Sequence, residues 1–204
     1  MIPGKVQVPE RWPRVAGVDL AASLRLKASW TVMFTAAVDP ETRRRYPLEI
    51  VRKRQHFPAT IRMIQEQYRK HRQTWIYVES NAYQKAVVEQ LVSQDRSIPV
   101  RAYQTGGEKH DETIGIPALA ASMANGSWLI PTGGTPHAAG CECGWCAWRR
   151  ELALYPQAET SDVLMAMWLA DLAARRALRY FGATVLAIDW SEERGYRIVT
   201  PTRR

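Results

Sequence analysis

Cysteine is scarce in this 204-residue chain, and long apolar runs are absent. The three cysteines all lie between residues 141 and 146, which argues against a disulfide framework and favours free thiols or a metal site. No apolar run approaches the roughly 20 residues of a membrane-spanning helix. Residues 1–12 also lack the apolar core of a signal peptide. We therefore expect a cytoplasmic protein that does not engage membranes.

The composition is that of a soluble globular domain, and the charge is strongly basic. Hydrophobic residues make up 46% and charged residues 24%, as in ordinary globular proteins. The length suffices for one well-buried domain. The 28 Lys and Arg against 20 Asp and Glu give a formal charge of +8. Such a surplus favours a polyanion, most commonly nucleic acid, although a basic surface kept for solubility fits the charge equally well.

The order of the predicted elements indicates an α/β fold with a mixed sheet. Three strands joined by short links predict an antiparallel meander, and the strands that follow alternate with helices, which predicts parallel crossovers. The strands are expected at 15–20, 30–38, 47–54, 74–79 and 98–103. The helices are expected from Pro58, and at 82–92, 111–125, 145–154 and 161–181, followed by a hairpin of 184–190 with 195–199.

The chain is predicted to be a single domain spanning residues 1–204, with a core of about 15–181. Residues 131–146 are rich in Gly, Pro and Cys and are interpreted as a loop insertion, and residues 182–204 as a C-terminal tail.

Three carboxylates fall where this fold would bring them together. Asp19 and Glu79 each end a buried strand, and ligands of open α/β sheets bind at the carboxyl ends of parallel strands. Asp162 lies in the first turn of the last helix, after Ser161 as N-cap, where the helix dipole stabilises its ionised form. This arrangement matches the ribonuclease H fold. In such sites two divalent ions about 4 Å apart clamp the scissile phosphate, and oxygen ligands suit Mg²⁺ or Mn²⁺. Asp19 would bridge the ions, with Glu79 and Asp162 on either side.

The same residues carry a resemblance to a known family, the nuclease domain of phage large terminases, over residues 15–178. The matching segments are Gly17-Val18-Asp19-Leu20-Ala21, Val78-Glu79-Ser80-Asn81, Lys109, Glu151-Leu152-Ala153-Leu154-Tyr155-Pro156 and Ser161-Asp162-Val163-Leu164-Met165-Ala166. The resemblance implies Asp19, Glu79 and Asp162 as catalytic metal ligands. It also implies packaging partners, namely an ATPase motor, a small terminase and a portal, in the host cytoplasm if a phage or prophage encodes the chain.

Three features depart from the family pattern. Ser29 and Ser161 stand where the family usually has acidic residues, so the second metal is expected to bind weakly. The family's N-terminal ATPase needs a Gly-x-x-x-x-Gly-Lys-Ser/Thr loop, and Thr105-Gly-Gly-Glu-Lys lacks that spacing. The chain is accordingly expected to be either an excised domain or a free-standing nuclease module.

A second metal site is predicted at His137, Cys141, Cys143 and Cys146, which supply four ligands within ten residues. Such ligands suit a structural zinc ion. Three reduced thiols on a loop are the alternative, because the Cys-x-Cys spacing is tighter than the usual gap of two residues.

Basic residues predict sequence-independent, salt-sensitive contacts with the DNA backbone. Solvated surface charge is the alternative. The predicted DNA-binding residues are Arg43, Arg44 and Arg45 between the second and third strands, Arg52, Lys53 and Arg54 on the third strand, and Lys109 after the fifth.

The favoured function is a metal-dependent endonuclease that cuts double-stranded DNA by two-metal hydrolysis, as the terminase resemblance implies. Two alternatives remain. One is a nuclease on the same fold that prefers Holliday junctions. The other is a catalytically weakened module that binds DNA without cleaving it.

Overall fold

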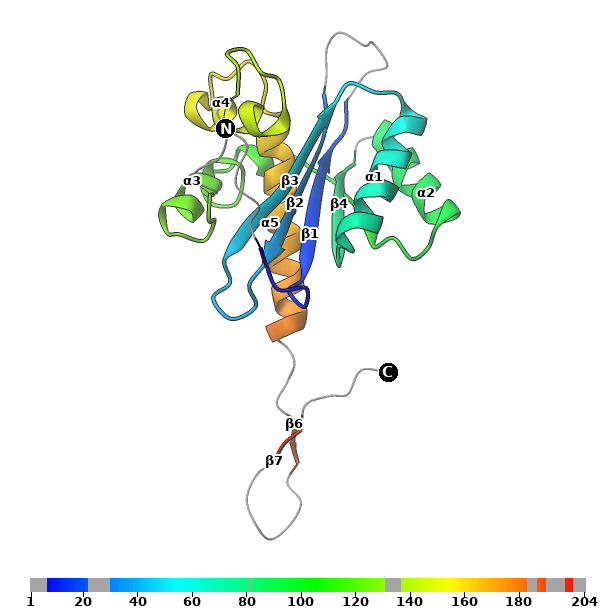
Figure 1. Ribbon diagram of the computed structural model, residues 1–204, viewed down its shortest axis with the longest axis vertical. Coiled ribbons are helices and arrows are strands. Elements are labelled where there is room, and N and C mark those ends of the chain that lie inside the picture. Colours follow the sequence, from blue (N-terminus) through cyan, green and yellow to red (C-terminus); the bar gives the residue numbers. More distant parts are fainter. Residues whose placement is uncertain are drawn as a thin grey trace.

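A five-stranded mixed sheet forms the centre of the protein, with the strand order β3-β2-β1-β4-β5 (Figure 1). The computed structural model describes residues 7–21, 30–80, 82–130, 137–182, 187–189 and 197–199. The strands are β1 (Arg14–Asp19), β2 (Thr31–Val38), β3 (Arg45–Lys53), β4 (Trp75–Glu79) and β5 (Val100–Tyr103). The β3-β2 and β2-β1 pairs are antiparallel, and the β1-β4 and β4-β5 pairs are parallel. The predicted mixed sheet is therefore confirmed.

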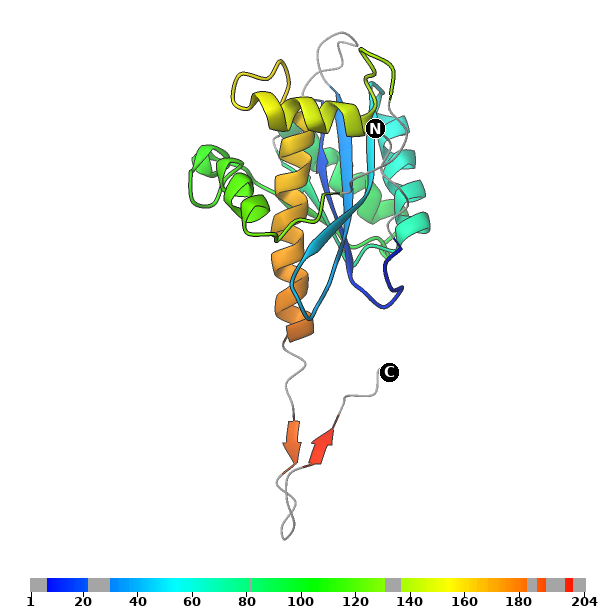
Figure 2. The same ribbon diagram turned by 60° about the vertical axis from the view of Figure 1, so that its left-hand side comes forward.

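Helices cover both faces of this sheet, and Figure 2 shows the strands between α1 and α5. The helices are α1 (Phe57–His71), α2 (Ala82–Gln94), η1 (Gly107–His110), α3 (Pro117–Ala124), α4 (Gly144–Leu154) and α5 (Asp162–Gly182). One core joins α1 and α2 to Val18, Ile76 and Val78. The other joins α3, α4 and α5 to Val15 and Phe34. Alternate residues of β1 thus face opposite cores, as expected of a strand buried on both faces.

Helix α5 approaches β1 unusually closely, and Gly17 makes this possible. A Cβ atom at Gly17 would lie 2.0 Å from the carbonyl oxygen of Ala166 and 2.4 Å from the backbone nitrogen of Ala170. Five alanines of α5 are fully buried: Ala166, Ala170, Ala173, Ala174 and Ala177. The glycine of the Gly-Val-Asp segment therefore sets the distance between helix and sheet.

Two element predictions are wrong in detail. The helix expected over 111–125 is confined to Pro117–Ala124, because the Asp111 carboxylate accepts hydrogen bonds from the N–H groups of Thr113 and Ile114 and holds a turn there. The third strand begins at Arg45 rather than Pro47, because Arg45 and Tyr46 continue the pairing with Val38 and Ala37. Of the expected C-terminal hairpin, β6 (Ala187–Asp189) and β7 (Arg197–Val199) pair antiparallel, and its remaining residues lie outside the described residues.

None of the helices in the described part of the chain is long and apolar enough to cross a membrane.

Candidate active site

Asp19 and Glu79 end adjacent parallel strands. The last paired residues of β1 and β4 before them are Val18 and Val78. Val18 and Val78 both face the α1–α2 core, so the alternation of a strand turns Asp19 and Glu79 to the other face. Asp19 is 9% exposed, and its carboxyl group hydrogen-bonds to that of Glu79. The sheet thus brings two acidic side chains together at the edge predicted from the sequence.

Asp162 comes to this edge as the first residue of α5. Its carboxylate accepts a hydrogen bond from the backbone N–H of Trp30 and lies near the positive charge of Arg52. The start of α5 is fixed by Glu151 of α4, which is 2% exposed. The Glu151 carboxylate accepts hydrogen bonds from the N–H groups of Val163 (2.9 Å) and Leu164 (3.0 Å). Glu151 therefore caps the helix that carries Asp162.

Burial and like charge raise the pKa of the acidic side chains at this edge. The pKa of Asp19 is raised well above its ordinary value by burial first, then by Glu79 and by the charge of Asp162, while Lys109 opposes the shift. Burial also raises the pKa of Asp162, against the effects of Arg52 and the Trp30 N–H. The sheet edge therefore gathers acidic side chains that ionise less readily than exposed carboxyl groups do.

Thr105 and Lys109, which both follow β5, position the side chain of Glu79. The Thr105 hydroxyl donates a hydrogen bond of 2.6 Å to Oε1 of Glu79, and the Lys109 ammonium lies 3.9 Å from the same oxygen. Lys109 is 37% exposed, so it can also meet a bound anion. The prediction that Lys109 lies near the carboxylates is consistent with this geometry.

The end of β3 carries basic side chains toward the same edge. Thr31 pairs with Lys53, and Val32 pairs with both Asp19 and Arg52. Arg52 and Arg54 lie over the Trp30 ring, with guanidinium carbons 3.7 and 4.2 Å from its centroid. Beside them is a pocket of about 260 Å³ whose lining includes Trp30, Arg52, Arg54, Arg150 and Glu151.

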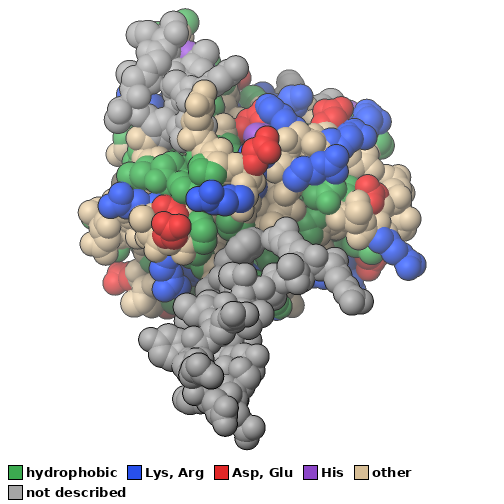
Figure 3. Space-filling model, turned by 60° about the horizontal axis from the view of Figure 1, so that its bottom comes forward, with side chains coloured by type: hydrophobic (Ala, Val, Ile, Leu, Met, Phe, Trp, Pro, Cys, Tyr) green, Lys and Arg blue, Asp and Glu red, His purple; other side chains and the backbone are tan. Residues whose placement is uncertain are grey.

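The other three predicted DNA contacts lie elsewhere. Val38 pairs with Arg45, whereas Val32 pairs with Asp19, so Arg43 and Arg44 are about 20 Å from the acidic edge along β2. The prediction that Arg45 contacts DNA is wrong. The Arg45 side chain is buried, and its Nε lies 3.0 Å from the fully buried carboxylate of Asp171. Arg45 therefore contributes to the core and is not available to DNA. Figure 3 shows this opposite end of the molecule, where basic groups are interspersed with acidic ones.

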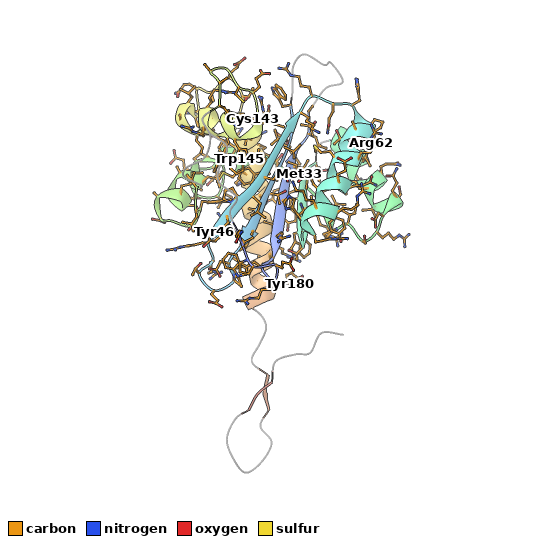
Figure 4. The ribbon with its side chains drawn as sticks, in the orientation of Figure 1. Met33, Tyr46, Arg62, Cys143, Trp145 and Tyr180 are labelled. Atoms are coloured by element: carbon orange, nitrogen blue, oxygen red, sulfur yellow. The ribbon has the colours of Figure 1, made fainter. Side chains whose placement is uncertain are left out.

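The predicted zinc ligands converge at the start of α4. Nδ1 of His137 lies 3.1 Å from the Cys141 sulfur and 3.2 Å from the sulfurs of Cys143 and Cys146. Among the described residues, no other group of three or more Cys, His, Asp or Glu side chains brings its ligand atoms within 4.8 Å of one another. The carboxylates of Asp19, Glu79 and Asp162 are therefore spaced more widely than the ligand atoms of the Cys/His cluster. Figure 4 labels Cys143 at the end of the molecule opposite Tyr180.

The thiol pKa values in this cluster move in opposite directions. Hydrogen bonds from the Cys143 backbone N–H, His137 and the Cys143 side chain lower the pKa of Cys141 to about 6. Burial raises the pKa of Cys146.

Sequence reasoning missed the roles of Thr105, Glu151 and the Trp30 N–H. Thr105 follows β5 at the carboxyl edge of the sheet, and that position was a usable signal. The reach of Glu151 to α5 depends on tertiary packing and had no local signal. Of the two serine departures, Ser161 is exposed just before α5, and Ser29 lies outside the described residues.

Comparison with known proteins agrees with this architecture. The model of the terminase RNase H-like domain family matches residues 16–147, more than half of the chain. No curated protein sequence matches the chain.

Three solved structures are similar. The human cytomegalovirus terminase nuclease domain is 11% identical, with 86% of this chain and 90% of that chain covered and a TM-score of 0.56. Thermus thermophilus RuvC in complex with Holliday junction substrate is 13% identical, with 84% and 97% covered and a TM-score of 0.49. The Mn-bound nuclease domain of the large terminase of bacteriophage SPP1 is 13% identical, with 56% and 70% covered and a TM-score of 0.38.

The cytomegalovirus likeness shows the fold alone. The family match extends from β1 to α4 and includes the strands that carry Asp19 and Glu79. The chain has an RNase H-like fold and belongs to the terminase RNase H-like domain family.

Proposed function

We propose that this protein is a divalent-metal-dependent endonuclease that hydrolyses phosphodiester bonds of double-stranded DNA. The observation that carries the proposal is the arrangement of three acidic side chains at one sheet edge: Asp19 and Glu79 end the adjacent parallel strands β1 and β4, and Asp162 begins α5. Membership of the terminase family supports it.

The acidic edge fits hard divalent cations. Its donors are carboxylate oxygens, which suit Mg²⁺ and Mn²⁺, and burying like charges together is unfavourable without a compensating cation. Asp19, Glu79 and Asp162 are the residues that would hold these ions. When bound, the ions would activate water and stabilise the leaving oxygen.

The remaining residues orient the site and attract DNA. Thr105 fixes the Glu79 carboxylate, and Glu151 fixes the start of the helix that carries Asp162. Lys109, Arg52, Lys53 and Arg54 would neutralise phosphates near the scissile bond, giving salt-sensitive binding. Arg43 and Arg44 would contact only DNA that extends to the far end of the sheet. We infer that the biological role is DNA cutting during phage packaging, with an ATPase motor, small terminase and portal as partners.

The test is cleavage of plasmid DNA with Mg²⁺ and with Mn²⁺. The parent is expected to nick and linearise plasmid, and Asp19→Asn, Glu79→Gln and Asp162→Asn are expected to lose at least about 100-fold in rate. Glu89→Gln is the matched control, because Glu89 is 67% exposed on α2 and forms an exposed ion pair with Lys85. Cleavage that persists in all three variants would refute the assignment.

The two alternatives are separated by substrate. A four-way junction cut much faster than linear duplex would indicate a junction-resolving enzyme. Salt-dependent duplex binding without cleavage under either metal would indicate a binding module.

A further inference from the structure

The Cys/His cluster has a geometry that hydrogen bonding does not explain. Three sulfurs surround one ring nitrogen, His137 Nδ1, at 3.1–3.2 Å. That nitrogen carries either one proton or one lone pair, so it can satisfy one sulfur well, not three. Tetrahedral zinc with Zn–S near 2.3 Å and Zn–N near 2.0 Å would place the ring nitrogen about 3.5 Å from each sulfur. The observed separations are only a few tenths of an ångström shorter, and all four ligand atoms lie within 4.8 Å.

The cluster also sits at a favourable place on the backbone. Cys143 is the N-cap residue of α4, and Cys146 lies in its first turn. The positive end of the helix dipole favours negatively charged ligands at this position and opposes the effect of burial on Cys146. Cys143 and Cys146 have the two-residue gap common in zinc sites, and Cys141 and His137 close the set from the preceding segment.

The segment that carries these ligands is joined to β3 beside the acidic edge. Arg52 donates a hydrogen bond of 3.1 Å to the carbonyl oxygen of Glu142. Arg150 donates one of 2.7 Å to the carbonyl oxygen of Cys141. Gly144 permits contact with β3, since a Cβ there would lie 2.4 Å from the Ile50 carbonyl oxygen. The ligand-bearing backbone thus helps to place Arg52, which in turn lies near Asp162.

We propose that His137, Cys141, Cys143 and Cys146 bind one zinc ion, and that this ion holds residues 141–146 where their carbonyl groups anchor Arg52 and Arg150 beside the acidic edge. Zinc binding itself does not depend on the proposed nuclease activity. The positioning role deepens the proposed function, because Arg52 is among the residues that would contact DNA.

The first experiment measures metal content in the full chain purified without added zinc. About one zinc per chain is expected, with loss in Cys143→Ser and His137→Ala and retention in His56→Ala, whose histidine is exposed at the start of α1. Because the first two variants could fail to fold, the parent is also exchanged into Co²⁺, and the thiolate charge-transfer bands of a tetrahedral site are expected. Less than half a zinc per chain together with no such bands overturns the proposal.

Alkylation distinguishes zinc from a disulfide. All three thiols of the untreated parent should resist alkylation and become reactive after chelation alone. Thiols that need a reductant before they react would show a disulfide and overturn the proposal.

The second experiment follows amide hydrogen exchange before and after chelation, so it needs no nuclease activity. Loss of protection is expected in residues 141–146, at the end of β3 and at the start of α5. The amides of α1 and α2 report global unfolding and should not change. If chelation alters exchange only within residues 137–146, the positioning role is wrong even where zinc is bound.

Discussion

Replacing Gly17 by alanine should separate α5 from β1 and thereby affect both stability and metal binding. The added Cβ would lie 2.0 Å from the Ala166 carbonyl oxygen and 2.4 Å from the Ala170 nitrogen. Ordinary carbon contacts are about 3.5 Å, so the helix must move out by about 1 Å or more. The atoms that would clash with the new Cβ belong to the backbone of α5, so they cannot be moved aside by a side-chain rotation.

Two effects oppose each other in this variant. Alanine reduces the conformational entropy of the unfolded chain, which stabilises by about 0.4–1 kcal/mol. Overpacking a close-packed core costs about 1–3 kcal/mol, occasionally more, and a clash with backbone belongs at the upper end of that range. The net loss should therefore be about 2–3 kcal/mol, a fall in Tm of roughly 4–12 °C for a chain of this length.

Thermal and urea unfolding of Gly17→Ala, followed by circular dichroism, would check this value. Gly106→Ala is the matched control, because no atom lies within 4 Å of its Cβ position, and its stability should change by less than about 1 kcal/mol. The variant should also bind Mn²⁺ more weakly, because Asp162 moves with α5 while Asp19 stays on β1. A Gly17→Ala protein that melts at or above the temperature of the parent would refute the close-approach argument.

Three further sets of substitutions should change the stability of the fold in a direction that the structure predicts. The raised pKa of Asp19 means that the folded protein keeps the Asp19 carboxyl group protonated to a higher pH than the unfolded chain does, so ionisation of Asp19 destabilises the metal-free fold as pH rises above about 4. Metal-free Asp19→Asn should therefore have a higher Tm than the metal-free parent at pH 7. Mg²⁺ should raise the Tm of the parent but not that of Asp19→Asn. His71 and Lys70 lower the pKa of Glu49 to about 2, so Glu49→Gln should be less stable than the parent at pH 7, with the gap closing as pH falls from 4.5 toward 2 in urea titrations. Asp171→Ala strands the buried Arg45 guanidinium and should cost about 3–5 kcal/mol, whereas Arg45→Met with Asp171→Leu should recover most of that loss; equal stability of Asp171→Ala and parent would contradict the buried pair.

The acidic edge was predictable because its information is local and topological. Asp19 and Glu79 each follow a run of strand-forming residues, and the helix between the third and fourth strands predicts a parallel crossover, so that both carboxylates are expected at the carboxyl edge of one mixed sheet. Residues whose side chains contact partners far away in the sequence were harder to predict. Arg45 resembles its neighbours Arg43 and Arg44 in sequence, and only the packing of α5 against β3 reveals Asp171 as its buried partner.

The helix expected over 111–125 shows a different limit. Its composition favours a helix, but the Asp111 side chain competes for backbone N–H groups, and the outcome depends on the local turn. The convergence of His137 on all three thiols could be expected from their closeness in sequence. The attachment of that segment to Arg52 could not, since β3 lies some 90 residues earlier in the chain.

The contact between α5 and β1 divides the protein into two parts with different freedom to vary. On the α5 side, alanine and glycine backbones touch directly, so the spacing of the carboxylates is fixed by main-chain atoms. On the α1–α2 side, larger side chains such as Ile64 and Leu91 fill the gap and can be exchanged for others of similar volume. Descendants of this chain should therefore diverge freely on the α1–α2 face, while the alanine seam of α5 changes little.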